Sequence, residues 1–285
     1  MNVDPDEAPP ASRHRDARAN RMHPGWPLLA ALVAAGLAGL WYWNHEREAR
    51  LAAPVPGPAA TAPQAPAPEA PGAPPIAHPV PPPADPSKPL PALADSDAAV
   101  RSVLVELFGS EAVGRLFVGE DAIRRFVATV DNLPRKTVAA RLMPVKPVPG
   151  GFVTSGADDA TTIDARNAYR YRPYVLAMEG VPAKRLVAAY AYLYPLFQAA
   201  YRDLGYPNGY FNDRLVAAID DMLAAPEVTA PRVTQPKVLY EFADPALEGL
   251  SAGQKILVRM GPDNAKRVKE KLRAIRSELT GERAP

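Results

Sequence analysis

The stretch from Pro27 to Trp43, PLLAALVAAGLAGLWYW, constrains this chain most, because nowhere else do apolar residues run so far without a charge. As an α-helix it would be about 25 Å long, near the lower limit for crossing the hydrocarbon core of a bilayer. Trp26 before the run and the WYW sequence at its end suit the two membrane interfaces, where aromatic side chains gather. The pattern predicts one transmembrane helix, residues 25–43, with membrane lipid around residues 27–43.

Two other interpretations of this run stay open. A helix buried in a soluble core would normally carry a polar face, which the run lacks. A cleaved signal peptide would have a short leader and small residues at its end, whereas 26 residues precede this run and it ends in aromatic residues. Both interpretations fit the sequence less well than a membrane anchor does.

The arginines around the run predict its orientation. Four precede it and two follow it closely: Arg13, Arg15, Arg18, Arg21, Arg47 and Arg50. An excess of Lys and Arg in a short flank tends to stay in the cytoplasm. We therefore expect residues 1–24 to form a disordered cytoplasmic tail and the C-terminal part to lie outside, in the periplasm if the membrane is a bacterial inner membrane.

Proline dominates the segment that follows the run. Between Pro54 and Pro91, 16 of 38 residues are proline, and most of the others are alanine. Such a composition cannot form a core and favours extended polyproline II, which at about 3.1 Å per residue would span roughly 100 Å. Residues 44–93 are therefore predicted to be a linker, although a ligand for a proline-binding module is an alternative.

The remainder, residues 94–285, is expected to fold as one mainly α-helical domain. Apolar residues recur there at helical spacing between caps, glycines and prolines. The expected helices run from Asp95 or Ser96 to Gly109 and over 110–118, 120–132, 165–179, 182–204, 211–226, 245–260 and 261–279, with extended chain at 152–154 and 233–242.

Four phrases of this domain resemble a known family: RRFVATVDNLPR (124–135), RYRPYV (170–175), YPLFQAAYRDLGYPNGYFNDRLVAAID (194–220) and QPKVLYEFADPALEGLSAGQKILVRMGPDNAKRVKEKLRAIR (235–276). The family is a bacterial one of membrane-anchored proteins known only as a domain of unknown function. The resemblance extends from about residue 100 to the end of the chain. It implies a membrane-tethered single domain and carries over no catalytic or binding residue.

Residue usage excludes several kinds of chemistry from residues 94–285. The chain has no cysteine, and all four histidines precede this domain: His14, His23, His45 and His78. Catalysis by Ser-His-Asp or Cys-His groups and zinc sites of the usual ligands are therefore not expected, and neither a metal nor a cofactor is predicted. The domain carries 26 Lys and Arg against 23 Asp and Glu, too mild an excess to predict nucleic-acid binding.

Two aspartates are the candidates for catalysis. Asp213 and Asp220 are seven residues apart, so they lie near one face of the same expected helix, about 10 Å apart along its axis. A carboxylate pair at such a distance could act as acid and base on a glycosidic bond. The alternative is structural: Asp213 is placed to cap the start of the helix, and Asp220 to lie on a solvated face.

Alternating tyrosines and arginines are the candidates for binding: Tyr169, Arg170, Tyr171, Arg172 and Tyr174. A buried tyrosine needs a hydrogen-bond partner for its hydroxyl, so a chain with many tyrosines places them in a hydrogen-bonded core or along a groove. A groove of Tyr and Arg side chains could stack on sugar rings or grip a peptide. Helical spacing of Tyr190, Tyr194 and Tyr201 with apolar residues favours the core for those three.

The sequence thus favours a non-enzymatic binding or scaffolding domain that a proline-rich stalk holds off the membrane, with an envelope protein or a glycan as its partner. A carboxylate-dependent glycan hydrolase is the alternative. A third hypothesis reverses the topology and makes the basic last helix, residues 261–279, a cytoplasmic contact surface.

Overall fold

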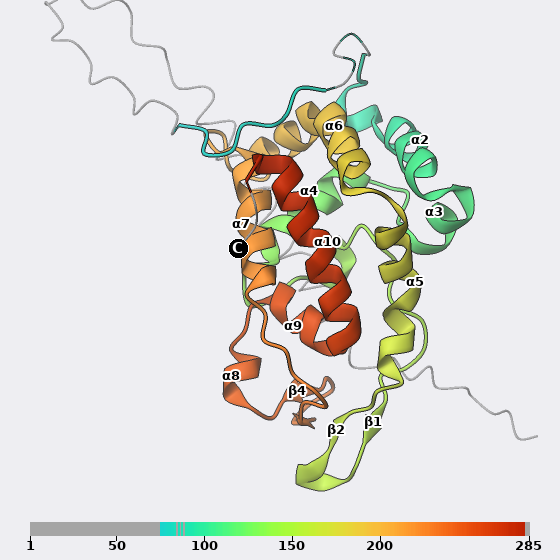
Figure 1. Cartoon of the computed structure of the whole chain (residues 1–285), viewed down its shortest axis with the longest axis vertical. Coiled ribbons are helices and arrows are strands. Elements are labelled where there is room, and N and C mark those ends of the chain that lie inside the picture. Colours follow the sequence, from blue (N-terminus) through green and yellow to red (C-terminus); the bar gives the residue numbers. More distant parts are fainter. Residues whose placement is uncertain (1–74, 84, 86, 88, 283–285) are drawn as a thin grey trace, which may run out of the picture. The chain divides into compact units, whose positions relative to one another are not determined.

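Glycine and proline set the ends of several helices in the computed structural model, which describes residues 75–83, 85, 87 and 89–282 (Figure 1). Gly109, with φ 81°, ends α2 (Asp97–Phe108). Gly261, with φ 86°, precedes α10 (Pro262–Thr280), whose first residue is a proline. Both features follow from the backbone, because glycine tolerates positive φ and proline has no N–H to leave unpaired at a helix start.

Nine α-helices, three short 3-10 helices and two small hairpins make up the described part of the chain. The other α-helices are α3 (Ser110–Leu116), α4 (Ala122–Asn132), α5 (Asn167–Gly180), α6 (Ala183–Asp203), α7 (Phe211–Leu223), α8 (Pro245–Glu248) and α9 (Ala252–Arg259). The 3-10 helices are η1 (Leu93–Asp95), η2 (Ala140–Leu142) and η3 (Asp158–Ala160), and the strands are β1 (Thr154–Ser155), β2 (Thr162–Ile163), β3 (Val233–Thr234) and β4 (Glu241–Phe242).

The main core lies where α4, α6 and α7 pack together. Phe211 is fully buried there, and its ring stacks on that of Phe197, with the ring centroids 5.7 Å apart. Val127 of α4 and Leu193 of α6 are buried in the same cluster. These residues carry the helical spacing seen in the sequence, so their burial explains why three helices form together.

A second core joins α10 to α5 and α9. Val175 of α5, Leu257 of α9 and Val268 of α10 are its buried centre. The helix α10 also packs on α6 and α7, through a cluster that includes Leu279. The apolar face of α10 is therefore part of the domain core.

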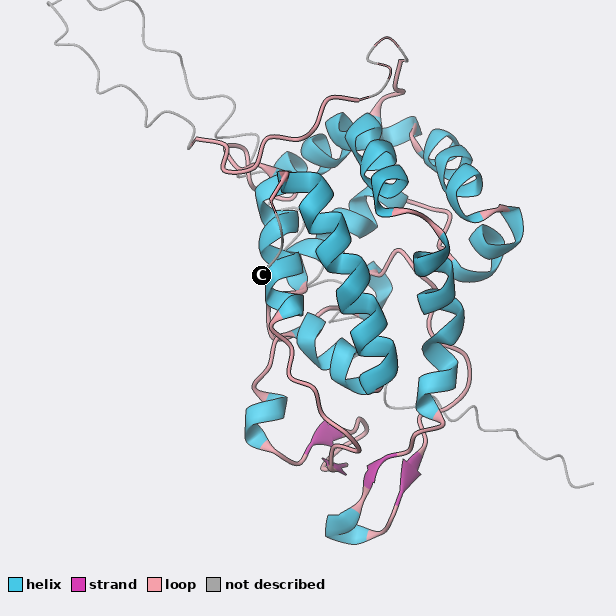
Figure 2. Ribbon diagram, in the orientation of Figure 1, coloured by secondary structure: helices cyan, strands magenta, loops and turns pink. Residues whose placement is uncertain are grey.

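The strands lie at one end of the helical body (Figure 2). The strands β1 and β2 pair antiparallel, with Thr154 opposite Ile163, and β3 and β4 do the same, with Val233 opposite Phe242. A bridge between Thr162 and Arg232 connects the two hairpins. Together they form a small irregular layer beneath the start of α5.

The expected elements are confirmed, with three differences. The segment 245–260 is two helices, because Gly249 ends α8 and Ser251 begins α9 with a capping box to Gln254. The expected strand at 152–154 is a hairpin, β1 with β2. The chain expected to be extended over 233–242 is a second hairpin, β3 with β4.

The predicted membrane helix, residues 25–43, lies outside the described residues. Among the helices that the structure does describe, none has the length and apolar character needed to cross a bilayer. Part of the expected linker is described, and it packs on the domain. Leu90 and Leu93 contact the main core, and the hydroxyl of Tyr192 on α6 lies 3.5 Å from the carbonyl oxygen of Pro89.

Candidate functional site

A pocket of about 430 Å³ lies at the N-terminal ends of α5 and α10, and we call it the α5/α10 pocket. Its apolar walls include Ile163, Pro231, Val258 and Pro262. Its polar lining includes Tyr169, Arg172, Arg259 and Asp263. Two helix starts, a hairpin strand and the end of α9 therefore converge on one concave surface, where binding sites are usually found.

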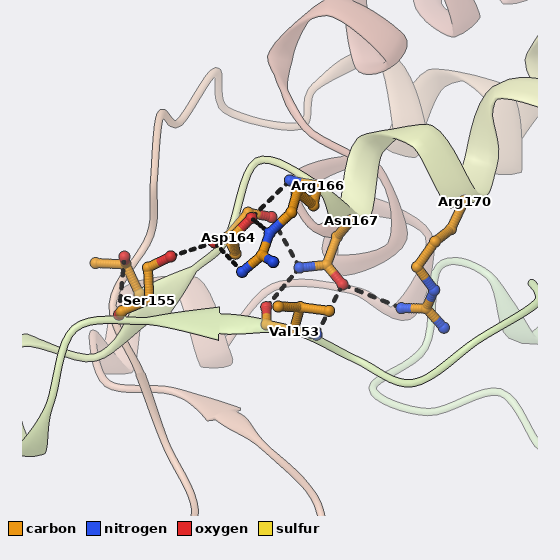
Figure 3. Close-up of polar contacts among 7 residues, drawn as sticks. Val153, Ser155, Asp164, Arg166, Asn167 and Arg170 are labelled. Carbon is orange, nitrogen blue, oxygen red and sulfur yellow. Dashed lines mark hydrogen bonds and ion pairs between the residues drawn. The ribbon is translucent and has the colours of Figure 1, made fainter.

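Asn167 holds the start of α5 beside the hairpin (Figure 3). This buried side chain donates through Nδ2 to the carbonyls of Val153, at 2.6 Å, and Asp164, at 2.8 Å. Its Oδ1 accepts from the amide of Val153 and from Arg170 Nη1, both at 3.1 Å. An amide side chain with all these bonds formed fixes the backbone around it, because leaving any of them unmade inside the protein is costly.

Asp164 forms the turn before α5, also shown in Figure 3. Its carboxylate accepts from Arg166 Nε at 2.8 Å, from Arg166 Nη2 at 3.0 Å and from the hydroxyl of Ser155. These bonds stabilise the ionised form, so the pKa of Asp164 lies well below its ordinary value, chiefly because of Arg166 and then Ser155. The carboxylate of Asp164 is therefore ionised and neutralised by Arg166, and the rim of the pocket is conformationally fixed here.

Asn264 fixes the other side of the pocket. It is buried in the first turn of α10, and its Nδ2 donates to the carbonyl of Ala168, at 2.9 Å, and to that of Met260, at 3.0 Å. The first bond ties α10 to α5 directly. The two helix starts therefore stay in register with each other, and the pocket between them is preformed.

Tyr169 and Arg172 of the pocket lining are available to a ligand. Tyr169 is 70% exposed. Arg172, three residues further along α5, is also exposed. Neither makes a hydrogen bond or ion pair with any residue that the structure describes. Arg259, by contrast, lies 4.8 Å above the ring of Phe242 and donates to the carbonyl of Tyr240 at 3.3 Å. The pocket thus offers a phenol ring and a guanidinium group to solvent beside fixed walls.

The other three predicted binding residues have structural contacts instead. Arg170 donates to the carbonyls of Pro149 and Gly150, both at 2.8 Å. Tyr171 packs against the second core, and burial raises the pKa of its hydroxyl. Tyr174 donates to the carbonyl of Lys146 at 2.9 Å. The structure therefore brings only Tyr169 and Arg172 together at the pocket.

The candidate catalytic residue Asp213 holds the segment that enters the domain. Its Oδ1 accepts from the amide of His78 at 2.7 Å and its Oδ2 from the amide of Ala77 at 3.1 Å. The neighbouring Asn212 is buried and donates to the carbonyl of His78 at 2.8 Å. These two side chains bind both backbone groups of His78, which lies in a bend of this segment.

The other candidate, Asp220, pairs with Arg276 of α10, with 2.6 Å between Asp220 Oδ1 and Arg276 Nε. This contact joins α7 to α10 on the side of the domain where α10 ends. Each predicted catalytic carboxylate thus has its own structural partner. No group of three or more His, Cys, Asp or Glu side chains that could hold a metal is present in the described ranges.

The long helix α6 carries its tyrosines into the main core, as their spacing predicted. Tyr190 donates to Asn212 Oδ1 at 3.0 Å, and burial raises the pKa of its hydroxyl strongly. Tyr194 donates to Gln198 Oε1 at 2.9 Å. Tyr201 stacks on Tyr206, with their centroids 4.5 Å apart. Each of these tyrosines therefore has a defined place in the packing.

Sequence reasoning missed Asn167, Arg259 and Asn264. Asn167 and Asn264 lie near helix starts, where asparagine is common. Composition and spacing alone therefore do not distinguish them from ordinary helix-start residues. Arg259 reaches the pocket only because α9 packs beside the second hairpin. The sequence held no local signal for that proximity.

The comparison with protein families identifies the chain. A family model described as a protein of unknown function, DUF3014, matches residues 122–276. The chain belongs to the DUF3014 family. This confirms the resemblance seen in the four phrases, and the DUF3014 match runs from the start of α4 into α10, so it includes all residues of the α5/α10 pocket named above. No curated protein and no solved structure matches the chain significantly.

Proposed function

We propose that this DUF3014 protein is a membrane-tethered binding or scaffolding domain of the bacterial cell envelope, and that the α5/α10 pocket holds its partner, an envelope protein or glycan. The observation that carries this proposal is the presence of two exposed side chains, those of Tyr169 and Arg172, over a preformed pocket. A tyrosine ring stacks on sugar or peptide groups, and an arginine reads carboxylates with two parallel hydrogen bonds.

The surroundings of this pair support binding. The walls are fixed by Asn167 and Asn264, so a ligand would lose little affinity to ordering of the protein. Asp263 also lines the pocket and offers an acceptor for an amine or hydroxyl group. A ligand that carries both hydrogen-bond donors and acceptors along an extended backbone therefore fits this lining.

The tether is proposed from the sequence. Residues 25–43 would span the inner membrane once, with residues 1–24 in the cytoplasm and the helical domain in the periplasm. Because Ala77, His78 and residues 89–93 contact the domain, the spacer would be the segment 44–74. A tethered domain on a stalk searches a defined layer next to the membrane, which suits a protein with a fixed envelope partner.

Site-specific photocrosslinking in intact cells tests the binding proposal. A photoreactive amino acid replaces Tyr169 in the full chain. We expect an adduct that Arg172→Glu removes and that Arg273→Glu, a charge reversal at an exposed position of α10, leaves intact. Sensitivity of the adduct to a protease or to a peptidoglycan hydrolase distinguishes a protein from a glycan. Absence of any adduct, or an adduct indifferent to Arg172→Glu, contradicts the proposal.

Cysteine labelling tests the topology, since the chain has no native cysteine. Val238 is 85% exposed, so Val238→Cys places a reactive thiol on the domain surface. A membrane-impermeant maleimide should label Val238→Cys in intact cells and leave Asn20→Cys unlabelled until the cells are lysed. The reverse pattern would place the domain in the cytoplasm.

A further inference from the structure

A second hollow of the described residues, lined almost entirely by apolar side chains, lies away from the α5/α10 pocket, among α2, α4, α6, α7 and α10. It measures about 370 Å³ and is partly open to solvent. Its walls include Leu104, Phe126, Leu186 and Leu272. Tyr190 is its one lining residue with a polar side chain. The hydroxyl of Tyr190 is already bound to Asn212. The walls therefore offer nothing that water could bind, and an apolar occupant fits them.

A smaller hollow of about 160 Å³ adjoins this cavity. The two share four lining residues, Leu104, Phe117, Val118 and Ala122. The smaller one is polar, because Asp97, Arg101 and Lys146 line it. An apolar cavity therefore lies next to a hollow with charged side chains in its lining.

The charged groups of the smaller hollow favour an anion. The carboxylate of Asp97 is occupied, since it accepts the amides of Asp121 at 2.9 Å and Ala122 at 3.1 Å. Lys146 Nζ donates once, to the carbonyl of Gly114 at 2.6 Å, so part of its donor capacity remains. Arg101 has no hydrogen bond or ion pair within the described ranges and is exposed. The smaller hollow is therefore lined by one carboxylate that already accepts two amides and by two cations that have free donors.

We propose that the two hollows form one site for a long-chain fatty acid, with its tail in the apolar cavity and its carboxylate between Arg101 and Lys146. Size supports a single chain. An apolar cavity of about 150 Å³ holds one benzene molecule, so this cavity has room for roughly 15 carbon atoms. Charge complementarity at the adjoining hollow selects an anionic head over a neutral one.

Photolabelling of the full chain in its native membrane tests the site without detergent, whose tails would compete. The probe is a fatty acid with a diazirine on its tail, and labelled peptides are mapped by mass spectrometry. We expect adducts on α2 and α6 at the cavity. In Ala189→Trp an indole fills the cavity from α6, and cavity labelling should fall roughly tenfold. Ala188→Trp, at the exposed neighbouring position, should label like the wild type.

The head group is tested by charge reversal. Arg101→Glu should lower cavity labelling by the acid probe roughly tenfold, since one charge-assisted bond becomes a repulsion. Labelling by the corresponding fatty alcohol should not change, and Arg273→Glu should affect neither probe. Arg101 is exposed, so this variant keeps the fold even if Ala189→Trp does not.

Several results would overturn the proposal. These are adducts confined to residues 27–43, where bulk lipid is expected, or cavity labelling that persists in Ala189→Trp. Equal labelling by acid and alcohol that Arg101→Glu leaves unchanged would also overturn it. If Ala189→Trp instead abolishes chemical crosslinking between two copies of the chain, the occupant is a second copy and not a lipid.

Discussion

Arg214 of α7 binds Asp131 near the end of α4, with 3.0 Å between Arg214 Nε and Asp131 Oδ1. Asp131 is buried, and its Oδ2 also accepts from Arg135 Nη2 at 2.8 Å and from the hydroxyl of Tyr206 at 3.3 Å. All four residues belong to the phrases that carried the family resemblance. The network joins the end of α4, the turn after α6 and the start of α7, so it fixes three elements around one carboxylate.

The first prediction concerns this carboxylate. Asp131→Ala removes the carboxylate partner of Arg214 in a half-buried site, and we expect the free energy of unfolding to fall by about 3 kcal/mol. Urea unfolding followed by far-UV circular dichroism measures it, since the described domain contains no tryptophan. Asp203→Ala is the control, because its pair with Arg124 is solvent-exposed and should contribute under about 1 kcal/mol. Equal losses in the two variants would contradict the assignment.

The second prediction concerns the segment that Asp213 holds. Asp213→Ala removes both acceptors of the Ala77 and His78 amides, so their hydrogen exchange should accelerate roughly tenfold or more. Mass spectrometry can follow the segment 75–79 cleanly, because two of its five residues are prolines without an amide.

The matched control lies on the same helix. Asp220→Ala breaks the ion pair with Arg276 instead, and it should leave exchange at residues 77 and 78 unchanged. If both substitutions accelerate exchange equally, the effect comes from general loosening of α7 and not from the hydrogen bonds to Asp213.

The third prediction is a pH dependence. Arg267 donates to Glu179 Oε1 at 2.6 Å, and its hydrogen bonds hold the pKa of Glu179 below its ordinary 4.5. A carboxyl whose pKa is lower in the folded state stabilises the fold above pH 4.5, and this contribution is lost as the pH falls below 4.5 through the folded pKa. The wild-type urea midpoint should therefore fall between pH 5 and pH 3, and less steeply in Glu179→Gln. Glu111→Gln, at an exposed site of α3, should retain the wild-type slope.

The helices could be predicted because their signals are local. The helix α6 shows this: Pro182 precedes it, Gly205 follows it, and Leu193, Phe197 and Tyr201 recur at its period. The two-residue strands could not be predicted in the same way, since so short a strand shows no alternation. Their pairing depends on the contact of Ile163 and Phe242 with Val258 from α9.

The candidate site could be predicted only in part. Tyr169 and Arg172 were named from their residue types, and both line the pocket. Arg170, between them, turns to the loop at Pro149, because a helix sends neighbouring side chains about 100° apart. The partner of Asp213 lies 135 positions away in the sequence, so no spacing rule could identify it.

The last prediction uses Gly253, where α9 lies against Leu133 at the end of α4 and against Met222 of α7. Its amide donates to the carbonyl of Leu133 at 2.9 Å, and a Cβ added to it would lie 2.8 Å from Met222 Cγ. Gly253→Ala must displace that side chain, so we expect a net loss of about 1 kcal/mol although alanine is the better helix former. Gly114→Ala is the matched control, because α3 leaves open space there. It should gain up to about 1 kcal/mol by the same helix preference. A gain in both variants, measured by urea unfolding, would show that α9 can move away from Met222 at no cost.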